Sequence, residues 1–275
     1  MSRKREERVR VGDVTLHVER HGDTGPAVVM AHGLMGSVAL ATRFGERFEA
    51  LAAAGLRVVA YDARGHGRSE GGRAPADYRW SRHARDLAAL VETLHLAPAS
   101  LCGGSMGAGS ALLVALERPA LVDRLVLRAP PPFGDALAVA RRTFLPLALL
   151  YGLLGSERTA ALVTRLPSVR RLQRETPQND LRSFFASQRR ETVVPAIRGL
   201  LGERDPVPVA RFGEIHHRTL VLAHRGDPIH PMGSAEILGE RLRDARVVTV
   251  PDAGWAAAHA EEVTALVAGF LLEGR

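Results

Sequence analysis

Leu101-Cys102-Gly103-Gly104-Ser105-Met106-Gly107 is the stretch of sequence that decides the fold. It contains G-x-S-x-G, directly after an apolar run and directly before a helical pattern. A strand must therefore turn into a helix almost at once, which predicts a tight, strained corner that carries Ser105. Gly103 and Gly107 leave room at such a corner because neither has a Cβ atom. The context predicts that Ser105 is an exposed nucleophile and that the Met106 N–H faces the same space.

The size and composition indicate a soluble globular protein. The 275 residues suffice for one large domain, or for one domain with an insertion, and 46% of them are hydrophobic. The single cysteine, Cys102, excludes an internal disulfide framework and favours a reducing cytoplasm. The charged N-terminus shows no signal-peptide pattern. The most apolar stretch, Phe144 to Leu154, is too short to span a bilayer and contains Pro146. We therefore expect a cytoplasmic protein without an integral membrane segment.

The net charge of +7 and the pI of about 10.7 raise the question of an anionic partner. A nucleic-acid surface combines a basic stripe with aromatic platforms. Aromatic residues make up only 5% of this chain, which argues against nucleic acid. Attraction to an acidic substrate or to a membrane surface stays open.

Short apolar runs alternate with helical patterns along most of the chain. A hairpin with a Gly12-Asp13 turn comes first. The expected strands are Val9–Val11, Val14–Val18, Ala27–Ala31, Leu56–Tyr61, Ala99–Cys102, Arg124–Leu127, Thr219–Ala223 and Arg246–Val250. The expected helices are Thr42–Ala54, Trp80–Leu96, Met106–Glu117, Met232–Leu242 and Glu261–Leu272. The pattern predicts an α/β fold with a mostly parallel sheet of eight strands, flanked by helices on both faces. Sites in such sheets lie at the carboxyl ends of the strands.

The alternation breaks once, between Ala129 and Thr219, where only helical patterns occur. We expect residues 133–209 to form a helical cap over the site, and residues 1–132 and 210–275 to form the core. The cap carries arginines that are expected at its surface or, alternatively, against a carboxylate or a phospholipid headgroup. They include Arg165, Arg170, Arg171, Arg174, Arg189 and Arg190.

Four further segments at expected strand ends join the serine motif. They are His32-Gly33-Leu34-Met35-Gly36, Tyr61-Asp62-Ala63-Arg64-Gly65-His66-Gly67-Arg68-Ser69, Gly226-Asp227-Pro228-Ile229-His230-Pro231 and Pro251-Asp252-Ala253-Gly254-Trp255-Ala256-Ala257-Ala258-His259. With all five segments in this order, the chain resembles the α/β-hydrolase fold superfamily over essentially its whole length. The resemblance implies a serine esterase or lipase-like enzyme that needs no cofactor.

Elementary chemistry then assigns roles. A serine hydroxyl is a poor nucleophile until a base takes its proton, and a carboxylate holds that base in the right tautomer. Ser105 is the expected nucleophile and Asp227 the expected orienting acid. The resemblance implies an oxyanion hole formed by the N–H groups of Leu34 and Met106. It also implies structural roles for His32 and Asp62. A metal site is not expected, since His216 and His217 lack a third ligand at a suitable spacing.

The identity of the base is open, because Trp255 stands where the family usually has histidine. The favoured interpretation is His259, delivered by a longer loop or by one extra helical turn. A second is His230, three residues after Asp227. In a third, Trp255 replaces an ancestral or deliberately removed histidine, and the catalytic set of nucleophile, acid and base is incomplete.

The apolar run from Phe144 to Leu154 predicts an acyl or hydrocarbon pocket. Its alternative role is packing onto the core. We expect substrate contacts from Leu34, Leu149, Leu150, His230 and Trp255.

The sequence therefore predicts hydrolysis of a small-molecule carboxylic ester through an acyl-serine intermediate. A lyase or C–C bond hydrolase with the same residues is an alternative, and His32-Gly33-Leu34-Met35-Gly36-Ser37 also resembles the loop of a menaquinone-pathway lyase. A second alternative is a weakly active or non-catalytic binding protein, because Trp255 stands where the family usually has the catalytic histidine. A homodimer stays open.

Overall fold

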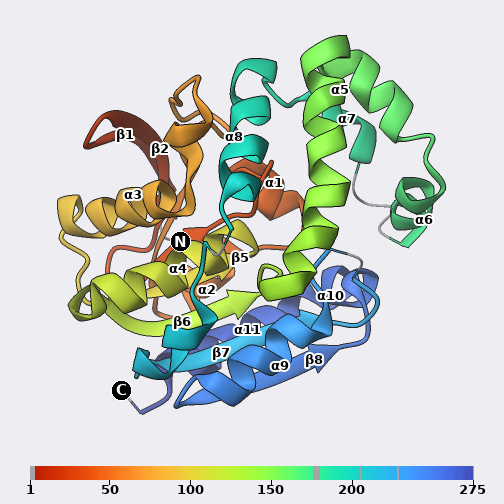
Figure 1. Ribbon diagram of the computed structural model, residues 1–275. Helices are drawn as coiled ribbons and strands as arrows, with labels where there is room; N and C mark the ends of the chain where they lie inside the picture. The colour runs from red at the N-terminus through yellow and green to blue at the C-terminus, as the bar shows by residue number, and fades with distance from the viewer. Residues whose placement is uncertain (1–3, 176–179, 205, 228, 275) are drawn as a thin grey trace.

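The computed structural model describes residues 4–175, 180–204, 206–227 and 229–274. Its centre is one eight-stranded sheet in the order β1-β2-β4-β3-β5-β6-β7-β8 (Figure 1). The strands are β1 Arg5–Val11, β2 Val14–His21, β3 Ala27–Ala31, β4 Arg57–Tyr61, β5 Ala99–Gly104, β6 Val122–Arg128, β7 Arg218–His224 and β8 Ala245–Val250. The β1–β2 and β2–β4 pairs are antiparallel, and all the others are parallel. The expected mostly parallel sheet is confirmed.

Helices cover both faces of this sheet. Side chains alternate between the two faces along each strand, and apolar side chains on both faces need a cover. In β3, Val29 packs into one hydrophobic cluster, together with residues of α3 (Trp80–Thr93), α4 (Met106–Glu117) and α9 (Met232–Arg241). The preceding residue, Val28, packs into a second cluster with residues of α1 (Val38–Arg43), α2 (Phe48–Ala53) and α11 (Ala260–Leu272). A strand apolar on both sides reads as a continuous run, as β3 does.

One helical expectation needs correction, and the structure adds one short helix. The helix expected over Thr42–Ala54 is split into α1 and α2, because Gly45 adopts φ +99° between them. The chain also forms a short helix, α10 (Ala253–Ala258), immediately after β8. The Asp252 side chain caps it by accepting a hydrogen bond from Trp255 N.

The residues between β6 and β7 form a helical insertion. It contains α5 (Leu137–Val163), α6 (Pro167–Glu175), α7 (Leu181–Ala186) and α8 (Arg190–Gly202). Figure 1 shows these helices gathered at one side of the molecule, with α5 and α8 packed along each other. Their contacts enclose a third hydrophobic cluster, which includes Leu147, Tyr151 and Ile197 and also takes in Met35 from the loop after β3.

The helix that contains the apolar stretch around Pro146 is longer than that stretch. The stretch lies inside α5, and residues 134–163 are long and apolar enough to cross a membrane by length and composition alone, although Gly155 interrupts the helix with a kink at φ 74° and ψ 177°. Core helices of soluble proteins meet the same criterion. The side chains of Leu147, Ala148 and Tyr151 are buried among α5, α7 and α8, so one face of α5 is already occupied by protein.

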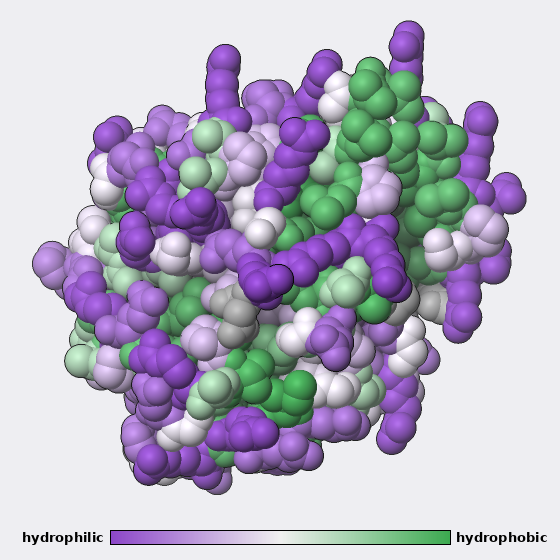
Figure 2. All heavy atoms as spheres, in the orientation of Figure 1, coloured by the Kyte–Doolittle hydropathy of each residue, from purple (hydrophilic) through white to green (hydrophobic). Residues whose placement is uncertain are grey.

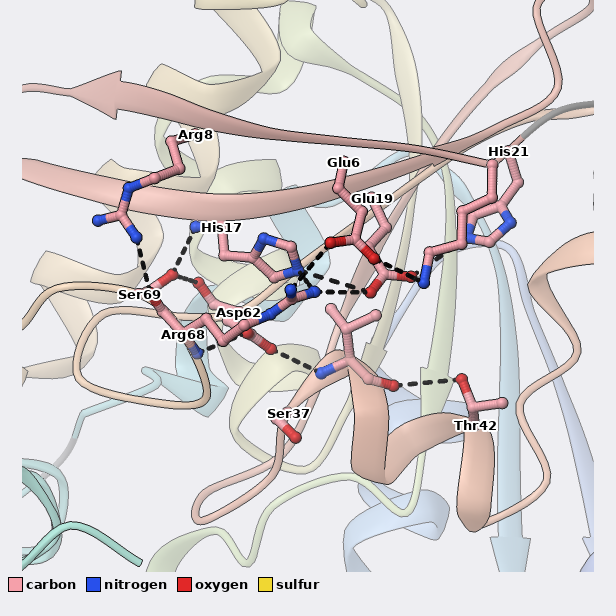
Figure 3. Close-up of polar contacts among 12 residues, drawn as sticks. Glu6, Arg8, His17, Glu19, His21, Ser37, Thr42, Asp62, Arg68 and Ser69 are labelled. Atoms are coloured by element: carbon pink, nitrogen blue, oxygen red, sulfur yellow. Dashed lines mark hydrogen bonds and ion pairs between the residues drawn. The ribbon is translucent and has the colours of Figure 1, made fainter.

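A polar network ties the loop after β4 to its neighbours (Figure 3). The Asp62 carboxylate accepts hydrogen bonds from Val38 N at 2.7 Å and from Arg68 N at 2.8 Å. Ser69 Oγ donates to the Asp62 carbonyl at 2.5 Å and accepts from His17 N at 2.8 Å. Asp62 therefore has the geometry of a structural partner, and it fixes the start of α1 beside the carboxyl ends of the strands.

Candidate active site

The turn at Ser105 has the strained geometry that its glycines suggest. Ser105 adopts φ 50° and ψ −109°, between the end of β5 and the start of α4. A Cβ atom on Gly103 would lie 2.3 Å from the backbone carbon of Gly107, and one on Gly107 would lie 2.1 Å from Ala31 O. Both atoms belong to the backbone and cannot move aside cheaply. The two glycines thus allow β5, α4 and β3 to meet at this corner.

The loop after β3 lies directly against this corner. A Cβ atom on Gly33 would be 3.3 Å from Ser105 Cβ. Gly36 N donates to Gly33 O at 2.9 Å, which closes a turn whose central residues are Leu34 and Met35. Met35 has φ 63°, the left-handed conformation that the third position of a type II turn requires.

His32 holds the base of that turn. Ala63 N donates to His32 Nε2 at 2.9 Å, so the other nitrogen, Nδ1, carries the proton and donates to Gly33 O at 2.7 Å. Burial lowers the pKa of His32 to about 4, which keeps the ring neutral and this tautomer in place.

A continuous chain of hydrogen bonds links Ser105 to His230 and Asp227. His230 Nε2 lies 2.8 Å from Ser105 Oγ, and His230 Nδ1 lies 2.8 Å from Asp227 Oδ2. A carboxylate only accepts, so His230 Nδ1 is the donor to Asp227. The Nε2 lone pair of the neutral ring then faces the Ser105 hydroxyl, which is the arrangement a general base needs.

Asp227 is held by more than His230. Its Oδ1 accepts the backbone N–H groups of Ile229 at 2.8 Å and His230 at 3.0 Å. His224 Nε2 lies 3.1 Å from Oδ2 and donates to it as well. Burial alone would raise the pKa of Asp227, but the hydrogen bonds from His224 and His230 outweigh burial and hold the pKa well below its usual range. The same contact with Asp227 raises the pKa of His224.

The histidine beside Ser105 is not the one that the favoured sequence interpretation expected. His259 ends α10, its ring is stacked on Trp255 at 4.2 Å between ring centroids, and its Nδ1 lies 2.9 Å from Trp255 O. The extra helical turn therefore turns His259 toward Trp255 instead of delivering it to Ser105. The second interpretation, His230, matches the geometry.

A cavity of about 420 Å³ opens beside Ser105 and His230. Its wall is mostly apolar and combines the loop after β3, α1, α5, α6 and α7. The lining includes Leu34, Met106, Phe144, Leu181, Phe184 and Phe185. Arg128 and Glu46 also line it, and they pair with each other.

The expected substrate contacts divide into two groups. Leu34 and His230 line the cavity. Leu149 is 52% exposed, Leu150 packs into the third hydrophobic cluster, and Trp255 packs against the second; none of them lines the cavity. Within the apolar run only Phe144 does so, because the side of α5 that carries Leu149 faces away from α7 and α8.

Sequence reasoning missed His224 and the aromatic residues of α7. His224 directly precedes the Asp227 loop, and its position at a strand end is the only sequence signal for it. Within the described residues, no group of three or more His, Cys, Asp or Glu side chains is arranged to hold a metal ion.

Comparison with known proteins identifies the family. Residues 26–257 match the family model described as the alpha/beta hydrolase fold. The chain belongs to the α/β-hydrolase family. It is 30% identical to a 2-hydroxy-6-oxononadienedioate/2-hydroxy-6-oxononatrienedioate hydrolase of Paraburkholderia xenovorans, over 94% of this chain and 91% of that protein. It is 31% identical to a putative carbamate hydrolase, RutD, of Variovorax paradoxus, over 90% and 91%.

A third relative matches over a shorter region. It is the sn-1-specific diacylglycerol lipase ABHD11 of Mus musculus, 40% identical over 45% of this chain and 36% of that protein. Among solved structures, the enol-lactonase of Burkholderia xenovorans superposes with a TM-score of 0.81 at 22% identity, covering 97% of this chain and all of that one. This structural likeness confirms the fold of this α/β hydrolase.

Proposed function

We propose that this α/β hydrolase cleaves a carboxylic ester with an apolar acyl group, through an acyl-serine intermediate that water resolves. The observation that carries the proposal is the 2.8 Å contact between His230 Nε2 and Ser105 Oγ, with Asp227 on the other ring nitrogen. The base, by this proposal, is His230, which shares one loop with its acid.

The mechanism follows from the tautomer that Asp227 imposes. His230 Nε2 takes the proton of Ser105 as Oγ attacks the ester carbonyl, and later returns it to the leaving alkoxide. The positive charge that forms on the ring is stabilised by Asp227, whose depressed pKa keeps it ionised. In this proposal the developing oxyanion accepts from the Met106 amide, whose N–H has no helical partner because Met106 is the first residue of α4, and from the Leu34 amide in the turn after β3.

The cavity supports an uncharged, apolar acyl group. Its aromatic and aliphatic lining is continuous with Ser105, and Arg128, the one arginine among the described residues that line it, is already paired with Glu46. An anionic substrate would find little to compensate the loss of its hydration there. The helical insertion acts, in this proposal, as a cap that supplies most of the acyl-side wall.

Cleavage of a C–C bond is the second candidate, and the similarity to the Paraburkholderia hydrolase favours it. That protein's named substrates are dicarboxylates, whereas the lining described here favours neutral groups. Product analysis separates the two reactions: an ester yields an acid and an alcohol, whereas C–C hydrolysis yields an acid and a ketone or aldehyde. Independence of cofactors and a cytoplasmic location stay predictions from the sequence, and a homodimer stays open.

Labelling tests the nucleophile. A fluorophosphonate probe should modify Ser105 in the folded protein, and mass spectrometry locates the adduct. Ser105→Ala should abolish both the adduct and the hydrolysis of a p-nitrophenyl ester. A folded wild-type protein that stays unlabelled, beside a serine esterase that labels, contradicts the proposal and favours the non-catalytic alternative.

Two histidine variants identify the base. His230→Ala should lower kcat/KM for p-nitrophenyl butyrate by roughly 10⁴-fold or more, since residues that act as a unit cost almost the whole effect when one is removed. His259→Ala is the matched control and should change kcat/KM by less than about twofold. The reverse pattern would restore His259 as the base. If Trp255→His raises activity by orders of magnitude while His230→Ala is silent, the set of catalytic groups is incomplete without a histidine at that position.

A further inference from the structure

Helix α5 is apolar on two opposite faces, and only one of them is covered. Its buried side chains pack against α7 and α8. Leu145, Leu149 and Leu153 follow one another at intervals of four residues, so they share a face, and they are 39%, 52% and 70% exposed. A helix that is apolar all round is ordinarily buried all round. The outer face of α5 therefore lacks a partner in the described structure.

The exposed apolar surface continues beyond α5. Leu162 near the end of α5, Leu166 in the following turn and Leu172 in α6 are 43%, 47% and 40% exposed. Figure 2 shows hydrophobic residues gathered over this part of the molecule, with hydrophilic side chains projecting around them. Single exposed leucines are ordinary, but a set of this size on consecutive elements marks an interaction site. These six leucines are called the outer apolar surface below.

The charges around the outer apolar surface are mainly positive. Exposed arginines on α5, α6, α7 and the turns between them are Arg142, Arg158, Arg165, Arg170, Arg171, Arg174 and Arg182. Among the described side chains of residues 133–190, the exposed carboxylates are Asp135, Glu157 and Asp180. Arginines that surround an apolar helix face complement a surface that is anionic at its boundary and apolar beneath it.

The same surface adjoins the wall of the cavity. Leu172 belongs to the outer apolar surface and also lines the cavity beside Ser105. Phe44 is 40% exposed, lines the cavity as well, and packs edge-to-face against Phe184 of α7.

We propose that the outer apolar surface docks on an anionic phospholipid bilayer, with α5 lying in the interface and the cavity mouth directed at the lipid. The covered face of α5 remains on α7 and α8, so the helix lies on the membrane and does not span it. A second copy of this chain is the less favourable occupant. A twofold dimer would pair this surface with itself and bring the arginines of both copies together. The proposal concerns binding and does not rest on the proposed reaction.

Vesicle binding tests the proposal. Ser105→Ala protein, which retains its surface, is mixed with vesicles of phosphatidylcholine and phosphatidylglycerol, and the bound fraction is measured by flotation. We expect binding that weakens on adding salt and is at least about tenfold weaker with pure phosphatidylcholine. Leu149→Asp/Leu153→Asp should reduce binding about tenfold or more. Val247→Asp, at a 38% exposed position on β8, is the matched control and should bind like the parent.

Two further measurements exclude trivial outcomes. The double variant Leu149→Asp/Leu153→Asp is also made in the protein that keeps Ser105. It should have the thermal unfolding midpoint of the wild type, and its kcat/KM for a soluble p-nitrophenyl ester should lie within about twofold of the wild-type value. A loss of vesicle binding then cannot be ascribed to misfolding. The proposal is overturned if the parent does not float with anionic vesicles, or if the double variant binds as well as the parent. Sedimentation that shows a dimer lost in the double variant, without vesicle binding, would assign the surface to a second copy instead.

Discussion

Ser105 is held at φ 50° and ψ −109°, a backbone conformation that costs about 1–3 kcal/mol and persists only where the surroundings enforce it. The enforcement comes from the close approach of β5, α4 and β3, which the glycines permit. That part of the site could be predicted, since a G-x-S-x-G between a strand and a helix leaves the chain little choice.

The base could not be assigned with the same security. Family order placed it after β8, where the chain has Trp255 and then His259. What decides the geometry is local: Asp227 Oδ1 accepts the N–H groups of the residues two and three positions later. This turn brings the His230 ring back onto the Asp227 carboxylate. An aspartate followed by histidine at the third position is the signal that was available, and such side-chain turns are common for aspartate.

Gly107→Ala tests the packing at the corner. A Cβ atom there would lie 2.1 Å from Ala31 O, so β3 or α4 must shift. Overpacking of this kind typically costs about 1–3 kcal/mol, and we expect a loss of that size in urea unfolding, together with slower labelling of Ser105. Gly104→Ala is the matched control, since its Cβ would meet no atom within 4 Å. Equal stability of the two variants would contradict this account of the corner.

At the scale of elements, the strands follow their apolar runs closely because a buried parallel strand needs apolar residues on both faces. The helices follow less closely. Gly45 divides the first expected helix, while Pro146 does not divide α5. Tertiary packing of α5 on α7 and α8 outweighs the local preference against proline, and such packing is not visible in the sequence.

Three neighbouring histidines join the loop after β3, the loop after β4 and α3; His66 and His83 are buried, and His32 is half-buried. The rings of His32 and His66 are 5.2 Å apart, and those of His66 and His83 are 6.2 Å apart. Burial lowers the pKa of His32 to about 4. Burial, aided by the neighbouring His32, lowers that of His66 to about 3. All three elements thus meet around rings that must stay neutral.

This cluster predicts acid sensitivity. The unfolded chain binds protons at these histidines below about pH 6.5, whereas the folded chain does so only near pH 4 and 3. The free energy of unfolding should therefore fall as the pH drops from about 6.5 toward 4. In His66→Asn the loss of unfolding free energy over that range should be smaller by about 1–3 kcal/mol. In His95→Asn, at an exposed position, the loss should equal that of the wild type. Parallel slopes in urea titrations of the two variants would count against the cluster.

At the scale of the whole molecule, the helical insertion and the sheet make the cavity together. The sheet supplies Ser105 and the loops with His32 and His230, and the insertion supplies Phe144 from α5 and Phe185 from α7. The sequence indicated that an insertion exists, because strands are absent between residues 129 and 219. It did not indicate which face of α5 points inward, since apolar residues occupy both.

Of the two apolar faces of α5, only the inner one should therefore affect selectivity for the acyl chain. Phe144→Ala enlarges the cavity beside Ser105, so kcat/KM for longer p-nitrophenyl esters should rise relative to the butyrate. Each additional buried methylene is worth about 0.8 kcal/mol, which is a factor of about four per carbon while the new space lasts. Leu149→Ala, on the outer face of the same helix, removes a similar amount of apolar surface but should leave the chain-length profile unchanged. A shift caused by Leu149→Ala, or no shift with Phe144→Ala at unchanged stability, would mean that the acyl chain does not occupy this cavity. The profile across a series of esters thus tests whether the substrate lies on the side of α5 that faces Ser105.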